Sequence, residues 1–478
     1  MKLTHLYATE LSEAVTQIYP DVPGDLQLQL VNSSHAQELA LPDKWWQDNL
    51  LGRQLAEKDF ALCRQAVAQK YGGHQFGHWN PMLGDGRGLL LGEVENRANQ
   101  RIDLHLKGAG QTPYSRQGDG RAVLRSTLRE YIGSEALFHL GIPTSRSLCL
   151  FDSQEMVLRE TPETAAMMIR TAPSHIRFGH FEYYYHAGDS AALKRLFEHA
   201  FIHHFPEALS EKNPHQALLK AIVLRTARMI ALWQAYGFVH GVMNTDNMSV
   251  HGITFDFGPY AFMDNFVSNA VFNHTDHQGR YAFDQQPGVA LWNLNALAQA
   301  FSEYCDTEQI KQTLMLFEPA FISAYQQTMV NRLGFSDVDN TSLGLVNRFL
   351  TMLANQQRDY HQHFRTLSAM DPTQAQCDLR DEFVDRDAFD TWWQDYRAHR
   401  QDEGNTDAQA ALMDSVNPVV IARTHHLQRA IDAARQGDYS IAAELIEALK
   451  TPFDDKWADT VWANAPVDDV QVSLSCSS

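Results

Sequence analysis

The sequence has 478 residues, of which 44% are hydrophobic and 20% charged, so it is long enough for two or three globular domains. Asp and Glu (58) outnumber Lys and Arg (39), and the net charge of −19 argues against a protein that binds nucleic-acid backbones. No signal peptide, metal-type cysteine spacing or apolar run of roughly 18 residues is present, so we expect a soluble, cytoplasmic, monomeric protein with no membrane or nucleic-acid partner.

The first part of the chain is expected to be a helical extension, followed by strands. Residues 1–70 contain short amphipathic pieces and end in a predicted helix at "WWQDNLLGRQLAEKDFALCRQAVAQ". "GLLLGEV" (88–94) and "RIDLHLKG" (101–108) alternate or run apolar and are predicted as two strands joined by a polar turn. A second strand pair is predicted at "SLCLF" and "MVLRET".

Two long helices and a helical C-terminal region follow. The first helix is predicted over 122–141, and the second over 214–237, where it begins at a proline and stops at a glycine. From about 290 the pattern is almost wholly helical, up to an acidic tail, "DDVQVSLSCSS", that we expect to be mobile. The interpretation is an α+β protein with a strand-rich lobe (71–175), a helical lobe (176–330) and a helical C-terminal region (331–478).

The tetrapeptide Gly-Asp-Gly-Arg occurs twice, at 84–87 and at 118–121. Glycines are used where the backbone turns tightly or approaches a ligand closely. Two ordinary turns are the simple alternative to a shared ligand site. The second copy precedes a predicted helix, whose free amides and dipole favour an anion.

The order of several polar residues along the chain matches that of the protein kinases. After the glycine turn come a strand lysine, Lys107, and a helix glutamate, Glu130; later come His240, Asn247 and Asp256-Phe257-Gly258. Taken singly, Lys107 and Glu130 would be read as solvent-facing charges. Val242 occupies the position where kinases carry the aspartate that serves as base.

Oxygen ligands for a metal ion are concentrated near the end of this order. Asp246, Asn247 and Asp256 are predicted in a turn and at a strand end, a pattern that suits Mg²⁺ bound together with phosphates. His274, Asp276 and His277 are too few for a transition-metal prediction and are expected to be polar residues near the cleft. The tryptophan pairs 45–46 and 392–393 are expected to pack in cores or between lobes.

Longer stretches identify a resemblance to a known family. "YGGHQFGHW", "LGDGRGLLLGE", "HLKGAGQTPYSRQGDGRAVLRSTLRE", "APSHIRFGHFE", "HGVMNTDNMS" and "NHTDHQGRYAF" resemble the selenoprotein O family, chiefly over about 70–300. The resemblance implies a kinase-like fold that binds ATP in a flipped orientation and transfers AMP to hydroxyl side chains of other proteins. It also allows transfer of UMP from UTP with Mn²⁺ in place of Mg²⁺.

The resemblance further implies roles for individual residues. Asp246 would be the proton acceptor, with Asn247 and Asp256 as metal ligands, and Lys107 would pair with Glu130 as in kinases. Arg170 and Arg177 would grip the terminal phosphate; without the family they could equally be surface cations on one helix face. The remaining nucleotide-binding residues would be Gly84, Gly86, Arg87, Asp119 and Gly120.

Three hypotheses about the function therefore remain open. Protein adenylyl transfer to Ser, Thr or Tyr is the first, a phosphotransferase acting on protein or small-molecule hydroxyls is the second, and a nucleotide-binding pseudokinase scaffold is the third.

Cys476 marks a possible redox position in the tail, whose alternative is an inert cysteine. Some bacterial relatives have a cysteine at the place that Phe272 occupies here, so no disulfide partner can be named.

Overall fold

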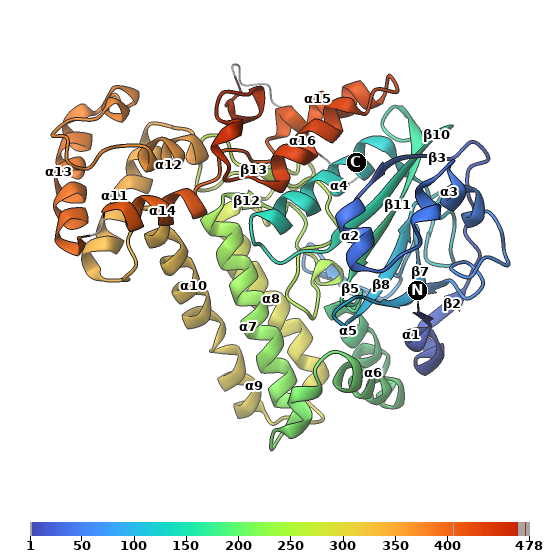
Figure 1. Cartoon of the computed structure of the whole chain (residues 1–478). Coiled ribbons are helices and arrows are strands. Elements are labelled where there is room, and N and C mark those ends of the chain that lie inside the picture. Colours follow the sequence, from blue (N-terminus) through green and yellow to red (C-terminus); the bar gives the residue numbers. More distant parts are fainter. Residues whose placement is uncertain (1, 405, 467–473, 475–478) are drawn as a thin grey trace.

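The computed structural model describes residues 2–404, 406–466 and 474. It is an α+β structure in which a nine-stranded sheet lies beside long helices, and a helical bundle extends beyond them (Figure 1). The strand order is β2-β4-β7-β8-β11-β10-β3, with β1 paired to β7 and β9 to β11, and these strands pair antiparallel. The strands are β1 (Leu3–Thr4), β2 (Val15–Gln17), β3 (Gln27–Val31), β4 (Val67–Gln69), β7 (Gly88–Glu95), β8 (Arg101–Lys107), β9 (Ala122–Val123), β10 (Arg146–Leu158) and β11 (Pro162–Ala172).

The predicted strand pair at 88–94 and 101–108 is confirmed as β7 and β8. Leu89 pairs with Leu106, and Gly88 pairs with Lys107 at the end of the sheet that carries the glycine turn. Although the sequence of β8 alternates between apolar and polar residues, both of its faces are buried: Asp103, His105 and Lys107 all have 5% or less of their surface exposed. The polar face of β8 is therefore available to line an interior site.

The second predicted strand pair is wrong. "SLCLF" and "MVLRET" do not pair with each other, because both contribute to the single strand β10, whose partner is β11. The polar letters between them resemble a turn, but the structure accommodates them in an irregular stretch, with a register shift between Asp152 and Met156. Such a bulge leaves no signal in the sequence that separates it from a hairpin turn.

The N-terminal segment is less helical than expected. Its helices are short, namely α1 (Leu6–Glu10), α2 (Ser33–Glu38) and α3 (Leu50–Leu55), whereas β1 to β4 join the main sheet. Segments of two to five residues have little intrinsic preference, so their pairing with β7 and β10 decides their conformation. The first 70 residues therefore build part of the sheet as well as helices.

Helices cover the sheet and continue away from it. α4 (Leu124–His139) and α7 (Pro214–Ala235) confirm the two predicted helices, and Gly237 after α7 has a φ of 60°. Near them lie two small antiparallel pairs, β5 (Gly73–Gln75) with β6 (His78–Asn80), and β12 (Phe238–Val239) with β13 (Ala261–Phe262). The other helices of this part are α5 (Phe178–Ala187), α6 (Ser190–His203), α8 (Gln286–Ala298), α9 (Thr307–Leu314) and α10 (Phe317–Arg332).

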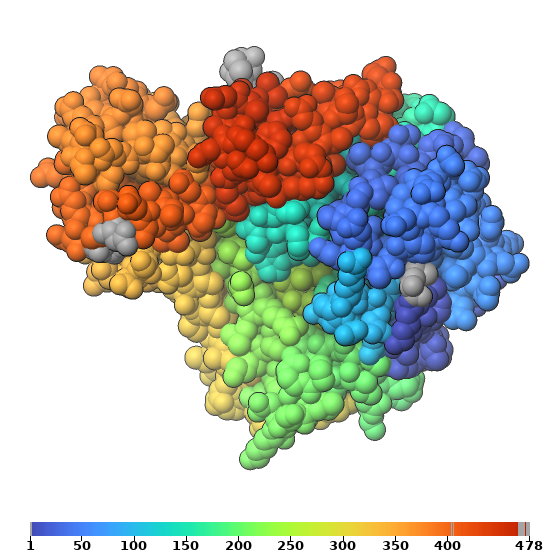
Figure 2. Space-filling model, in the orientation of Figure 1, coloured from blue at the N-terminus to red at the C-terminus, as the bar shows by residue number. Residues whose placement is uncertain are grey.

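The C-terminal region is helical, as predicted. α11 to α14 form the outer bundle, while α15 and α16 return across the molecule and lie over α4 (Figure 2). Trp392 and Trp393 are buried in this bundle, and Trp45 is buried near the sheet. The bounds are α11 (Asn340–Asn355), α12 (Tyr360–Ser368), α13 (Arg386–Glu403), α14 (Thr406–Val416), α15 (Thr424–Ala434) and α16 (Ser440–Lys450).

The predicted mobile tail and Cys476 fall outside the described residues, apart from Leu474. Leu474 is buried, and its carbonyl oxygen accepts a hydrogen bond from the backbone N–H of His274 at 2.9 Å. Among the helices that the structure describes, none combines the length and apolar character that crossing a membrane requires.

Candidate active site

A cavity of about 650 Å³ opens between the sheet, the start of α5 and the segment 242–259. Eleven of the twelve residues singled out from the sequence line it, and the twelfth, Glu130, lies behind Lys107. Residues up to 172 positions apart are thus gathered around one space, as the order of the sequence motifs suggested. The eleven are Gly84, Gly86, Arg87, Lys107, Asp119, Gly120, Arg170, Arg177, Asp246, Asn247 and Asp256.

Both Gly-Asp-Gly-Arg copies form part of the cavity wall. Gly84 has a φ of 142°, and a Cβ added there would lie 2.8 Å from the Gln69 carbonyl oxygen. Gly120 has a φ of 71°, and a Cβ there would lie 2.0 Å from the carbonyl oxygen of Gly110. These two turns require glycine for their backbone and packing, and they also face one shared cavity. The interpretation as ordinary turns is therefore compatible with the interpretation as a shared ligand site.

Lys107 and Glu130 form the expected ion pair. Lys107 ends β8 and Glu130 lies on α4; their exposed fractions are 5% and 1%, so neither is a solvent-facing charge. Burial lowers the pKa of Lys107. For Glu130 burial acts in the opposite direction, but the charges of Lys107 and Arg170 outweigh it and lower its pKa, so the carboxylate stays ionised.

Arg170 and Arg177 converge on Asp256 from different elements. Arg170 lies on β11 and Arg177 is the N-cap residue of α5, so the alternative of one shared helix face is wrong. Each guanidinium bonds one carboxylate oxygen of Asp256. Burial would raise the pKa of Asp256, but these two charges hold it well below its usual range. Arg177 also donates to the Asp246 carbonyl oxygen at 2.8 Å and lies between two aromatic rings.

Asp246 also lines the cavity, but its pKa is shifted in the opposite direction from that of Asp256. It lies in a one-turn 3₁₀ helix (Thr245–Asn247), and 8% of its surface is exposed. Burial raises its pKa to about 7, against the opposing charge of Arg177. Gln75 Nε2 lies 3.4 Å from Oδ2, and Oδ1 has no hydrogen-bond partner within the part of the chain that is described. A carboxyl group poised near neutral pH suits a proton acceptor.

The oxygen atoms of Asn247 and Asp256 fit a hard divalent cation. Asn247 Nδ2 donates to the Val242 carbonyl oxygen at 3.2 Å, which leaves the amide oxygen for another partner. Each carboxylate oxygen of Asp256 has a second lone pair beyond the one that accepts from arginine. Asp256 also has a φ of 59°, an uncommon conformation for a residue other than glycine and one frequent at functional positions. These are oxygen donors of the kind that a hard divalent cation accepts.

Within the cluster His274, Asp276 and His277, Asp276 has a structural explanation. Asp276 accepts hydrogen bonds from the backbone N–H groups of Arg280 (3.0 Å) and Tyr281 (2.7 Å). The carboxylate therefore closes a loop beside the main cavity, as expected of polar residues near the cleft.

Two sets of cavity residues were not found from the sequence. Asp85, inside the first glycine turn, points inward to His105 Nε2 (3.2 Å) and accepts from the Gln69 N–H (3.0 Å). Arg159 donates to Asp119 at 2.7 and 2.9 Å and lines the cavity. Asp85 is a letter of the repeated motif and could have been noticed, whereas Arg159 has no local pattern around it.

Comparisons with known proteins show which chains this sequence is similar to. The family model described as "Protein adenylyltransferase SelO" matches residues 2–450. A relative from Pseudoalteromonas atlantica, named "Protein nucleotidyltransferase YdiU", is 49% identical over 480 residues and covers both chains fully. Proteins of the same name from Erwinia tasmaniensis (43% over 482 residues, both chains fully covered) and Pseudomonas fluorescens (50% over 414 residues, 86% of this chain and 85% of the relative) are also similar.

Proposed function

Because the chain belongs to the SelO family of protein adenylyltransferases, we propose that it transfers AMP from ATP to Ser, Thr or Tyr hydroxyls of other proteins. It is an enzyme of the protein nucleotidyltransferase class, and UMP transfer from UTP is the variant of the same reaction. The observation that carries the proposal is the single cavity shared by both glycine turns, the Lys107–Glu130 pair, the two arginines and Asp246.

The chemistry assigned to these residues is an in-line displacement at the α-phosphorus. The acceptor hydroxyl gives its proton to Asp246, its oxygen forms the new bond to phosphorus, and the bond to pyrophosphate breaks. Arg170 and Arg177 stabilise the negative charge that develops on pyrophosphate, because guanidinium groups bind phosphate oxygens in pairs. A bound Mg²⁺ or Mn²⁺, held by Asn247 and Asp256, would neutralise phosphate charge.

We also propose that residues 71–175 and 176–330 are the two lobes of a protein-kinase-like fold, with the nucleotide flipped relative to ordinary kinases. The strand lysine paired with a helix glutamate, the glycine turn and Asp256-Phe257-Gly258 support the kinase likeness. The flipped orientation is supported by the position of Arg170 and Arg177 around Asp256, where they favour an anionic leaving group.

The test uses ATP labelled on either the α- or the γ-phosphate, with Mg²⁺ and a generic protein acceptor. We expect the α-label and one AMP per modified site to be retained in protein, and both to be lost in Asp246→Ala and Asp256→Ala. Asp438→Ala, a change at an exposed residue that does not line the cavity, is the control. Retention of the γ-label alone would make the protein a phosphotransferase, and retention of neither label with ATP still bound would make it a scaffold.

A further inference from the structure

A second group of ligand-type side chains lies beside the cavity and takes no part in the proposed reaction. It consists of His74 from β5 and of Glu182 and His186 from α5, whose nearest ligand atoms all lie within 4.8 Å of one another. His74 Nδ1 is 2.5 Å from Glu182 Oε2. We propose that these three residues bind one Zn²⁺-type transition-metal ion, at a site separate from Asn247 and Asp256.

The ligand chemistry selects this class of ion. Two imidazole nitrogens and one carboxylate are ligands that Zn²⁺ takes at about 2.0–2.2 Å, whereas Mg²⁺ prefers oxygen alone. Glu182 and His186 are four residues apart on α5, so they project from the same face of the helix. His74 approaches that face from the strand. Separations below 4.8 Å between the ligand atoms are short enough for one ion to bind all three after small side-chain movements.

Glu182 supplies an independent observation. Its side chain has an exposed fraction of 0%, and Oε1 accepts no hydrogen bond from any residue within the described ranges. A buried carboxylate oxygen without a partner is costly. Coordination to a cation would offset that cost, and the deep position of Glu182 fixes where the ion would lie.

The residues around the three proposed ligands leave the site open to solvent on one side. The ring of Trp79 is 4.2 Å from His186 and 5.2 Å from His74, and the ring of Trp292 is 5.2 Å from His74. These rings shield the ligands, while the exposed His186 provides the route from solvent. Three protein ligands and a water in the fourth position is a common zinc arrangement.

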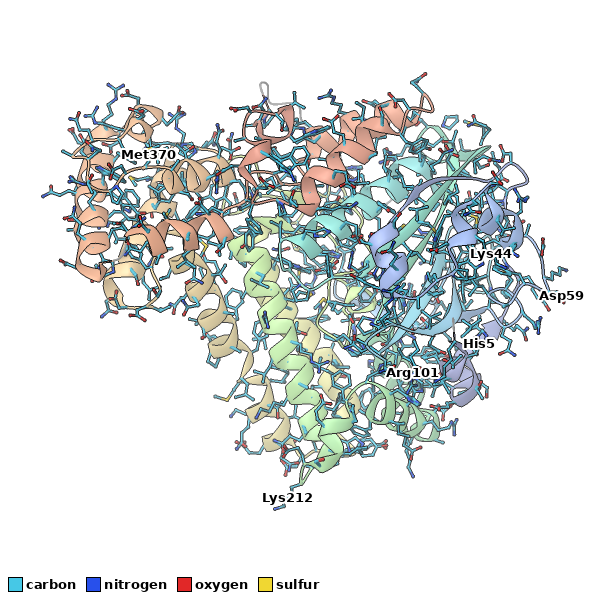
Figure 3. The ribbon with its side chains drawn as sticks, viewed as in Figure 1. His5, Lys44, Asp59, Arg101, Lys212 and Met370 are labelled. Atoms are coloured by element: carbon cyan, nitrogen blue, oxygen red, sulfur yellow. The ribbon has the colours of Figure 1, made fainter. Side chains whose placement is uncertain are left out.

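A second cluster with the same residue types makes a natural control. This cluster consists of Glu10, His199 and His203. Arg101 lies at the start of β8 (Figure 3), and its guanidinium is 2.7 Å from His203 Nδ1. Because arginine can only donate, His203 Nδ1 accepts, and Nε2 therefore carries its proton and donates to Glu10 at 2.9 Å. This cluster satisfies its hydrogen bonds by itself, and a guanidinium charge lies beside it.

The proposed ion would join two elements that hold Asp246 in place. The His74 N–H donates to Thr245 Oγ1 at 2.7 Å, and a Cβ on Gly73 would lie 2.8 Å from Asp246 Oδ1. Arg177, the N-cap residue of α5, bonds Asp256. Metal ions bind unprotonated imidazole and carboxylate groups, so binding of the proposed ion competes with protons. Its role is to position these elements, without contact with substrate.

The test is a Co²⁺ titration of the metal-stripped full chain, with excess Mg²⁺ present to occupy the oxygen-rich site. We expect one equivalent of Co²⁺ with the intense visible absorption of a four- or five-coordinate ion. His186→Ala, a change at an exposed residue, should weaken this binding by more than about tenfold, whereas His203→Ala should not change it. Zn²⁺ should raise the melting temperature of the wild type and of His203→Ala, but not that of His186→Ala.

Two results would overturn the site: absence of an intense Co²⁺ band in the wild type, or an unchanged Co²⁺ affinity in His186→Ala. His74→Ala provides a second reading of the same ligand set from the other element. Equal loss of Co²⁺ binding in His203→Ala would assign the ion to the Glu10 cluster and would equally overturn the proposal.

Discussion

Asp246 is the cavity residue whose ionisation changes nearest to neutral pH. Because burial raises its pKa to about 7 and only the ionised form accepts a proton, we expect kcat/KM for nucleotide transfer to increase from roughly pH 6 to 8. Asp246→Asn should lower activity by about 100-fold or more and remove this pH dependence. Initial rates across that pH range provide the measurement, and an unchanged profile in Asp246→Asn would exclude Asp246 as the base.

The same burial has a consequence for stability. Since the pKa of Asp246 is higher in the folded state than in the unfolded state, its contribution to stability is fully present below about pH 4 and is lost as pH rises through about 7. We therefore expect Asp246→Asn to raise the melting temperature by a few degrees at about pH 8 and to leave it nearly unchanged at about pH 4.5. Thermal scans without nucleotide or metal test this, and equal shifts at both pH values would contradict it.

Arg177 tests whether the cavity needs a guanidinium or only a positive charge. Its guanidinium carbon lies 4.5 Å from the centre of the Tyr71 ring and 4.6 Å from that of Phe255, and one nitrogen bonds both Asp246 and Asp256. Lysine reproduces neither the stacking nor the planar fork. We expect Arg177→Lys to weaken nucleotide binding by about tenfold or more, measured by calorimetric titration. Arg195→Lys, at an exposed pair with Glu13, should bind as the wild type does.

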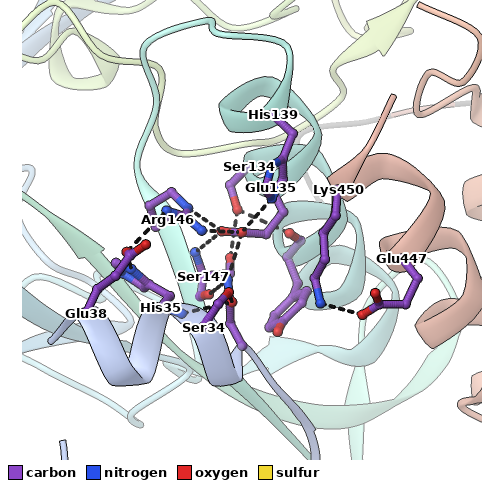
Figure 4. Close-up of polar contacts among 12 residues, drawn as sticks. Ser34, His35, Glu38, Ser134, Glu135, His139, Arg146, Ser147, Glu447 and Lys450 are labelled. Atoms are coloured by element: carbon purple, nitrogen blue, oxygen red, sulfur yellow. Dashed lines mark hydrogen bonds and ion pairs between the residues drawn. The ribbon is translucent and has the colours of Figure 1, made fainter. Parts of the chain in front are cut away.

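At the scale of elements, α4 is held in place by a buried carboxylate (Figure 4). Glu135 accepts hydrogen bonds from Arg146 (2.8 and 2.7 Å), Asn32 (2.7 Å) and the Ser147 N–H (3.0 Å). These contacts join α4 to β10 and to the start of α2. The helix that carries Glu130 toward Lys107 is therefore also held in place by Glu135, further along the same helix.

Removing the charge of Glu135 should destabilise the protein strongly. Glu135→Gln leaves the buried Arg146 with only the more distant carboxylate of Glu38 (3.8 Å), which is largely exposed, so we expect the free energy of unfolding to fall by about 3 kcal/mol. Glu447 pairs with Lys450 in the same view but is exposed, and Glu447→Gln should cost less than about 1 kcal/mol. Denaturant unfolding of both variants measures these changes. Similar losses of unfolding free energy in the two variants would contradict the special role of Glu135.

Sequence patterns predicted the elements that have a strong period of their own. β7, β8, α4 and α7 follow from alternation, helical spacing and terminal proline or glycine, and the Lys107–Glu130 pair follows from their order. β1 to β3 could not be predicted in this way, because their conformation depends on partner strands far along the chain. The Arg159–Asp119 pair was missed for the same reason. The two residues are brought together by the fold, and no local spacing in the sequence predicts their contact.

At the scale of the whole molecule, the C-terminal helices brace the sheet. Arg435 Nη2 lies 3.2 Å from Glu163 Oε2, which also accepts from Arg125 Nε of α4, and the Tyr439 hydroxyl donates to Asp152 of β10. A continuous apolar cluster extends from Tyr7 to Trp462 and includes buried residues of α4, α15 and α16. The described part of residues 331–478 therefore braces the strand-rich part of the molecule.

This continuity predicts that the cavity and the C-terminal helices unfold together. Leu445 of α16 has an exposed fraction of 0% and belongs to the shared cluster, so we expect Leu445→Ala to lower the free energy of unfolding by about 2–5 kcal/mol. Calorimetry should show one transition that moves to lower temperature in the variant and is shifted as a whole by ATP. Leu209→Ala, at a half-exposed leucine, should have a much smaller effect. An early transition that leaves ATP binding intact would instead make α15 and α16 a separate unit, because only then could they melt while the Lys107–Glu130 pair and the cavity remain folded.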